Sequence, residues 1–151
     1  MTLELSFQVV SGVAMLGWFL LAAATLSAHR GARERLLMVG GRATPLLLCV
    51  AYLALLILHW RSAPGGNFAS LDGVATLFAA RGKLLGGWVH YLAFDLFVGR
   101  WIVDDTLASQ CARWPLLFTL PLTFLFGPLG LLLHFAGRRV GASTPSVRGI
   151  A

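Results

Sequence analysis

One apolar stretch of the chain carries ionisable side chains in its interior, and these residues are the best placed to do chemistry. The stretch covers residues 84–103 and contains His90, Asp95 and Arg100. A carboxylate in the middle of a lipid-embedded helix costs a few kcal/mol, so it normally faces a protein interior or a hydrated cavity. Asp95 and His90 therefore fit the role of acid–base groups in a cavity.

The same residues also fit a structural role. In that reading, Asp95 accepts hydrogen bonds from Tyr or His side chains of neighbouring helices and holds those helices in register. Arg100 lies about 140° from Asp95 around a helix, so we do not expect an ion pair between them. The partners of both are expected on other helices, or among lipid headgroups for Arg100. In either reading Asp95 should be buried and hydrogen-bonded to a different helix.

Aromatic side chains share one broad face of this stretch at about 100° per residue. They predict one wall of a long apolar slot, with His90 and Asp95 at its polar end. The residues assigned to binding an apolar substrate are Tyr91, Phe94, Phe97 and Trp101.

Two further histidines, His59 and His134, lie in other apolar runs. A single histidine near a helix end is more often interfacial than a ligand, but either one paired with His90 is compatible with axial ligation of a haem. No spacing selects that cofactor. The sequence contains no metal-binding motif, phosphate loop or nucleophile elbow.

Four apolar runs position these residues. The chain of 151 residues is 58% hydrophobic and only 12% charged, whereas soluble domains have about 25% charged residues. Runs of about 20 apolar residues are long enough to cross a hydrocarbon core roughly 30 Å thick. We therefore predict an all-α, polytopic membrane protein with about four transmembrane helices in a small bundle. The predicted spans are residues 7–28, 43–60, 84–103 and 115–137, in a single domain over 1–140 with a disordered tail over 141–151.

The fourth run contains prolines and a Phe126-Gly127-Pro128 sequence. A proline inside a helix removes one backbone hydrogen bond and kinks the helix, and at membrane depth the freed carbonyls need partners. The sequence predicts a kinked fourth helix, which fits either a packing kink or a pocket wall opposite Asp95. Between the second and third runs, residues 70–80 are expected to form a short helix capped by Ser70 along the membrane surface.

The charge distribution indicates which partners to expect. Twelve Lys and Arg residues against six Asp and Glu residues give a net charge of +6. The arginines lie singly or in pairs between apolar runs, as expected for contacts with membrane lipid headgroups. No nucleic-acid-binding pattern accompanies them, so we expect no nucleic-acid partner. The sequence is also compatible with a homo-oligomer.

Two segments carry a resemblance to a known family. They are the run GWVHYLAFDLFVGRW from Gly87 to Trp101, followed by Asp104 and Asp105, and the run LTFLFGPLG from Leu122 to Gly130. Together they resemble the family of a plant abscisic-acid-deficiency protein, a plastid membrane protein implicated in converting violaxanthin to neoxanthin. The four-span layout matches this family over roughly residues 5 to 140.

The resemblance implies a carotenoid-related role, including an isomerase that opens an epoxide. In such a reaction an acid protonates the epoxide oxygen while a base removes a nearby proton. The matching ionisable positions are Asp95, His90, Asp104 and Asp105. The chain shows no leader like a transit peptide, so the expected location is a bacterial inner membrane.

The leading hypothesis is a membrane enzyme, isomerase-like, that acts on a carotenoid or another long polyene by acid–base chemistry. A first alternative is a non-catalytic protein that binds a carotenoid or supports a partner enzyme. A second is a small proton-coupled transporter with Asp95 as its proton relay.

Overall fold

The structure is a computed structural model that describes residues 2–109 and 112–142. All its regular elements are helical, which confirms the all-α prediction. They are α1 (Leu3–Leu26), α2 (Arg30–Met38), the π-helical turn η1 (Val39–Ala43), α3 (Thr44–Leu58), α4 (Leu71–Ala79), α5 (Arg81–Ala108) and α6 (Leu116–Ala142).

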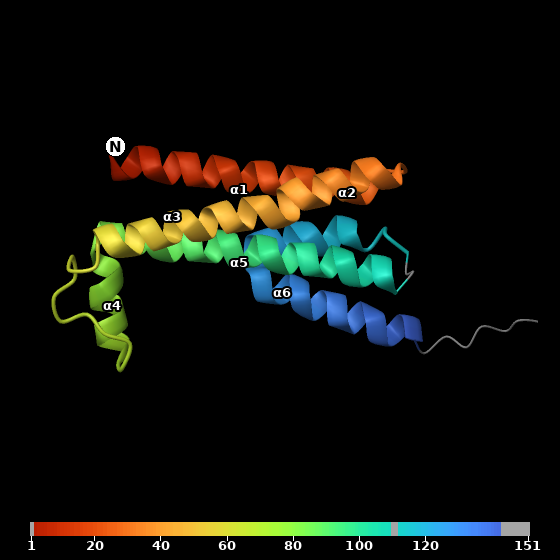
Figure 1. Cartoon of the computed structure of the whole chain (residues 1–151). Coiled ribbons are helices and arrows are strands. Elements are labelled where there is room, and N and C mark those ends of the chain that lie inside the picture. The colour runs from red at the N-terminus through yellow and green to blue at the C-terminus, as the bar shows by residue number, and fades with distance from the viewer. Residues whose placement is uncertain (1, 110–111, 143–151) are drawn as a thin grey trace, which may run out of the picture.

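Helix α5 lies at the centre of the bundle and runs parallel to α1. The start of each helix is joined by an ion pair between Glu4 and Arg81 at 3.6 Å. Further along, the indole of Trp18 packs so closely on Gly99 that a Cβ at Gly99 would lie 2.6 Å from the ring. The two helices therefore stay in contact over most of their length, in the same direction (Figure 1).

Helices α2, η1 and α3 form one continuous helical segment that runs antiparallel to α5. A Cβ at Gly41 would overlap the stem of Arg100 near one end of α5, and His59 packs on Gly82 near the other end. This helical segment starts at Arg30 rather than near residue 43, because charged residues outside the apolar run remain helical where they can reach water or other charges. The π-helical turn ends two residues before Pro45, which has no N–H to donate.

Helix α6 folds back on itself instead of crossing the bundle. Its backbone leaves the helical region at Phe126, with φ −143° and ψ 52°. A Cβ at Gly130 would lie 2.6 Å from the Cα of Thr123, although residues seven apart in a straight helix are about 10.5 Å apart. Figure 1 shows the two halves running in opposite directions and diverging from each other away from the turn. We call residues 116–125 α6a and residues 127–142 α6b.

Contacts with α1 fix the direction of α6a. Before it begins, Arg113 donates to the carbonyl of Ser27 at the end of α1, at 3.4 Å. Near its own end, the Phe124 ring meets the ring of Trp18 in the middle of α1, with centroids 5.6 Å apart. As α6a therefore runs back along α1, it is antiparallel to both α1 and α5.

Contacts with α5 show that α6b returns. Gly127, at its start, packs on Asp95 in the middle of α5, and His134 is hydrogen-bonded to Asp105 in the last turns of α5. α6b is therefore parallel to α5. This arrangement differs from the single kinked span expected over 115–137.

The sequence around the turn explains this reversal. Pro128 cannot donate to the carbonyl four residues before it, so the helical ladder is interrupted there. Gly127 and Gly130 carry no side chain where other groups approach closely. Pro128, together with the nearby Gly127 and Gly130, thus permits a sharp turn between α6a and α6b.

Among the described residues, three helical segments are long and apolar enough to cross a membrane: Leu3–Leu26, Arg30–Leu58 and Leu116–Arg138. The last qualifies by length and composition, although its path reverses at Phe126. α5 has 28 residues and is long enough, but its polar residues lower its mean hydropathy.

Helix α4 lies across the end of the bundle where α3 ends and α5 begins (Figure 1). The Ser70 hydroxyl accepts from the backbone N–H of Gly73 at 3.0 Å, which confirms the predicted short helix and its cap. Leu71 is 84% exposed at the start of this helix. At the other terminus α6 extends to Ala142, into the expected tail. The rest of the expected tail, residues 143–151, lies outside the described residues.

Candidate functional site

Asp95 lies in the middle of α5 against the tip of the α6 turn. Its exposed fraction is 9%, so the expected burial is confirmed. A Cβ at Gly127 would clash with its Oδ1 and lie 2.9 Å from its Cγ, which means that the carboxylate packs on the backbone at the start of α6b. Helix N-termini favour negative charge, and this contact places the carboxylate at one.

The hydrogen bonding of Asp95 differs from expectation. Its Oδ2 is buried and has no hydrogen-bond partner among the described residues. The group from another helix that contacts Asp95 is the backbone of Gly127. The polar side chain beside Asp95 is Tyr91, one turn earlier in α5. Because α6 turns back at this point, the approaching group is a bare glycine rather than a donor side chain.

Tyr91, like Asp95, contacts the backbone of α6 at its turn. Its hydroxyl lies 3.1 Å from the carbonyl oxygen of Leu125 and 3.4 Å from that of Phe124, and donates to them. Pro128 leaves the Phe124 carbonyl without its helical donor, and buried unpaired carbonyls are costly. Tyr91, assigned from the sequence to substrate binding, therefore caps the end of α6a.

A second polar cluster lies near the end of α5. The Nε2 atom of His134 is 2.7 Å from Oδ2 of Asp105, and their side chains are 8% and 22% exposed. Arg138 forms an ion pair with the same carboxylate. The Arg138 guanidinium, hydrogen-bonded to Asp105, lowers the pKa of this carboxyl despite its partial burial, and the His134 bond adds to that effect.

Sequence reasoning placed His134 at an interface and did not connect it with Asp105. One signal was available, because His134 and Arg138 are four residues apart and so share a helix face. Their carboxylate partner is 29 residues away from His134 in sequence. It could be recognised only once the direction of α6b was known.

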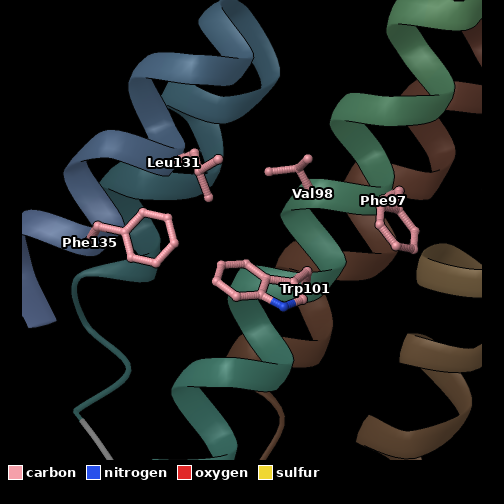
Figure 2. Close-up of a pocket in the computed structure, with 5 residues that line it drawn as sticks. All are labelled: Phe97, Val98, Trp101, Leu131 and Phe135. Atoms are coloured by element: carbon pink, nitrogen blue, oxygen red, sulfur yellow. The ribbon is translucent and has the colours of Figure 1, made fainter.

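An apolar groove of about 290 Å3 lies between α5 and α6b, open to the outside of the bundle. Figure 2 shows Trp101 and Phe135 facing each other across it. The lining residues are Phe97, Val98, Trp101, Leu131 and Phe135. Two of the expected substrate-binding residues, Phe97 and Trp101, thus lie in one groove.

The groove lies between the two polar sites along α5. Its residues on α5 fall between Asp95 and Asp105, which are about 15 Å apart along the helix axis. At the Asp105 end, the Trp101 ring meets the His134 ring edge-on, with centroids 5.6 Å apart and planes at 80°. The groove therefore has one end beside the histidine–carboxylate pair.

His90 and Phe94 lie on a different side of α5. Their rings are 4.6 Å apart between centroids, and the His90 ring is 5.7 Å from that of Tyr52 on α3. Asp95 instead packs on α6. The structure does not bring His90 and Asp95 into one site, nor does it place Phe94 in the groove.

Arg100 pairs within its own helix, contrary to the expectation of a partner elsewhere. Its Nε lies 2.7 Å from Oδ2 of Asp104, and its side chain is only 13% exposed. Residues four apart on a helix face each other, and the expectation had weighed only Asp95 as a partner. Asp104 is therefore paired with Arg100, whose side chain packs on Gly41 of η1. Asp105 is instead bonded to side chains of α6b.

The three histidines weighed as haem ligands have different neighbours. His90 faces Tyr52, His59 packs on Gly82, and His134 is bonded to Asp105. Within the described residues, no group of three or more His, Cys, Asp or Glu side chains is arranged to hold a metal ion.

Comparison with known proteins gives the family. The sequence profile of the ABA4-like (ABA DEFICIENT 4-like) family matches residues 5–134. The chain belongs to this family. The resemblance seen around Asp95 is thereby confirmed, and the match extends as far as His134.

A curated relative is protein ABA DEFICIENT 4, chloroplastic, from Arabidopsis thaliana. It is 28% identical over 102 residues, which cover 63% of this chain and 45% of the relative. The aligned region is thus less than half of that protein. Since the relative is chloroplastic, the comparison does not support the expected bacterial inner membrane. No solved structure matches the chain.

Proposed function

We propose that α1, α2–α3 and α5 cross the membrane and that α6 is a re-entrant helical hairpin. α5 runs beside α1 from the Glu4–Arg81 pair to the Trp18–Gly99 contact, so a membrane that α1 crosses must be crossed by α5 as well. α6a would reach about 15 Å into the membrane, about half of its hydrocarbon thickness.

The irregular backbone at the tip of this hairpin satisfies the main requirement for such a position. At membrane depth, non-helical backbone is tolerated only where protein or a hydrated cavity covers it. Tyr91 bonds the carbonyls at the end of α6a, and Asp95 covers the backbone at Gly127. The hairpin can therefore end at mid-depth without unpaired carbonyls facing lipid.

We propose that the protein acts on a carotenoid or a related long polyene that lies in the groove between α5 and α6b. The observation that carries this proposal is a groove lined by apolar side chains and open to the outside of the bundle, with the His134–Asp105 pair in contact with Trp101 at one end. An apolar ligand would enter from the membrane and lie along Trp101 and Phe135. Its oxygenated end would reach the polar groups near the membrane surface.

The chemistry that fits these groups is acid–base isomerisation. The groove ends beside titratable side chains that are hydrogen-bonded to one another, which suits proton donation and removal on a bound molecule. Membership of the family, together with the neoxanthin-related role implied by the resemblance, supports a carotenoid as the substrate class.

The test uses the purified full-length chain with violaxanthin, and with β-carotene as a polyene without oxygen. We expect saturable violaxanthin binding with a shifted absorption spectrum, and a new isomer of the same mass in the extracted pigment. Binding without an isomer would establish the non-catalytic alternative. Absence of both would contradict the proposed function.

One observation favours the transporter as a second candidate. Asp95 carries a buried oxygen without a partner among the described residues and lies at a broken helix, a combination found at the ion sites of transporters. Proton flux into vesicles containing the protein, lost in Asp95→Asn, would support this candidate. Vesicles that hold a pH gradient as well as empty ones do would exclude it.

A further inference from the structure

We infer that His134 and Asp105 form the proton-transfer pair of this protein, acting on the oxygenated end of a molecule in the groove. This inference rests on the proposed function and names the residues that would perform it. It adds His134, which the sequence analysis regarded as an interfacial residue. It also assigns the role of base to Asp105 rather than to Asp95 or His90.

The position of His134 supports the role of proton donor. Its Nε2 is hydrogen-bonded to Asp105 at 2.7 Å, which orients the ring. The other nitrogen, Nδ1, bonds to no group in the described part of the chain. The ring edge meets Trp101, a lining residue of the groove. His134 thus has one nitrogen held by Asp105, and its ring contacts a residue that lines the groove.

Asp105 is arranged to accept a proton. Both His134 and Arg138 bind the same oxygen, Oδ2, and Oδ1 accepts no hydrogen bond from the described residues. Arg138 stabilises the ionised carboxylate, so the base is already deprotonated. The Asp105 side chain is 22% exposed.

The step balances without a cofactor. Protonated His134 donates its Nδ1 proton to a ligand oxygen, and the electrons of the breaking C–O bond move to that oxygen. Asp105 Oδ1 takes a proton from the neighbouring carbon, and the electrons of that C–H bond form a new C=C bond. Asp105 then releases its proton to water at the membrane surface, and His134 takes one up. The product is an isomer of the ligand.

The other candidate acids are less well placed for this step. Asp95 packs on the backbone of Gly127, Asp104 is paired with Arg100, and His90 faces α3. None of these three lines the groove, and neither do His134 and Asp105, but the His134 ring contacts Trp101, which does line it. The histidine–carboxylate pair beside Trp101 is the one whose geometry meets both requirements.

The test compares variants of the full-length chain in lipid vesicles, with violaxanthin as the probe. His134→Gln and Asp105→Asn should bind violaxanthin within about threefold of the unaltered protein, while isomer formation per bound pigment falls by about 100-fold or more. Matched controls are His29→Gln and Glu34→Gln. His29 precedes α2 and makes no capping bond, and Glu34 forms an exposed pair with Arg30. Both controls should keep the full rate.

Unchanged rates in both His134→Gln and Asp105→Asn would overturn the inference and leave the proposed function standing. An unaltered protein that neither binds nor converts violaxanthin would overturn both. If a variant loses binding through misfolding, Asp105→Glu provides the second measurement. It keeps the charge opposite Arg138, so it should bind pigment and convert it more slowly. Full activity in Asp105→Glu together with full activity in His134→Gln would contradict the assigned roles.

Discussion

Helix α5 carries two carboxylates that meet α6 in different ways. Asp95, in the middle of the helix, packs on the bare backbone of Gly127 and lies beside Tyr91. Asp105, near the helix end, is bonded to His134 and Arg138. The first is enclosed by the turn of the hairpin, and the second has charged partners and remains partly accessible. The buried carboxylate of Asp95 thus contributes to the packing of two helices, while the partly accessible Asp105 lies near the groove.

Membrane topology offers the largest expected effect, because it is all-or-none. The three crossings that we propose would place the loop before α4 and the end of α6 on opposite sides. Ala69→Cys and Gly137→Cys, each with Cys49 and Cys111 replaced by Ser, should react with an impermeant thiol reagent from opposite faces of sealed vesicles. Ala69 is exposed, and a side chain at Gly137 meets nothing within 4 Å. Labelling from the same face would restore a fourth crossing and place Asp105 at a different depth.

Close packing at the Asp95 site predicts the next largest effect. Gly127→Ala should lower the free energy of unfolding by about 1–3 kcal/mol, because the new methyl group overlaps the Asp95 carboxylate. Gly137→Ala is the matched control and should be nearly neutral, since its Cβ has no neighbour within 4 Å. Unfolding midpoints in detergent provide the measurement. Equal midpoints for the two variants would refute the contact between Asp95 and the hairpin.

Tyr91→Phe tests the same site through its hydrogen bonds. Loss of the hydroxyl leaves the carbonyls of Phe124 and Leu125 without that donor. We expect a loss of about 1–2 kcal/mol in the same unfolding assay, smaller than an overlap of packed atoms. Tyr52→Phe serves as control, because the contact of Tyr52 is with the His90 ring rather than with a broken helix end. A neutral Tyr91→Phe would mean that water replaces the hydroxyl.

The polar cluster of Asp105, His134 and Arg138 predicts the smallest effect, a dependence of stability on pH. The pKa of Asp105 is lowered in the folded protein, chiefly by the hydrogen bond from Arg138. A lowered carboxyl pKa contributes stability at pH above the ordinary value, and this contribution is lost as pH falls toward the folded pKa. The unfolding midpoint should therefore fall on acidification more in the unaltered protein than in Asp105→Asn. Parallel pH profiles would show that the cluster contributes nothing to folding.

The contrast between the two sites also shows what the sequence can predict. The all-α fold, the Ser70 cap and the burial of Asp95 follow from local patterns, since apolar runs, caps and isolated charges act within a few residues. The proline and glycines near Phe126 indicated a break in the helix. They did not indicate its direction, because a kink and a reversal break the same backbone hydrogen bonds.

Everything that depends on the direction of α6b was therefore missed. The pairing of His134 with Asp105 joins residues on two helices that a straight fourth span would orient in opposite directions. The Arg100–Asp104 pair lies within one helix at a spacing of four, and sequence reasoning could have found it. The aromatic face was predicted as one wall, but packing against both α3 and α6 divides it between His90 and Trp101.

Violaxanthin binding to Leu131→Trp, compared with Leu132→Trp, tests the central claim most directly. Leu131 lines the groove, whereas its neighbour Leu132 is 63% exposed and does not. A tryptophan at 131 fills the space between α5 and α6b, so affinity should fall by about tenfold or more, equivalent to about 1.4 kcal/mol. Leu132→Trp should bind like the unaltered protein. Equal affinities in the two variants would show that the polyene does not lie in this groove.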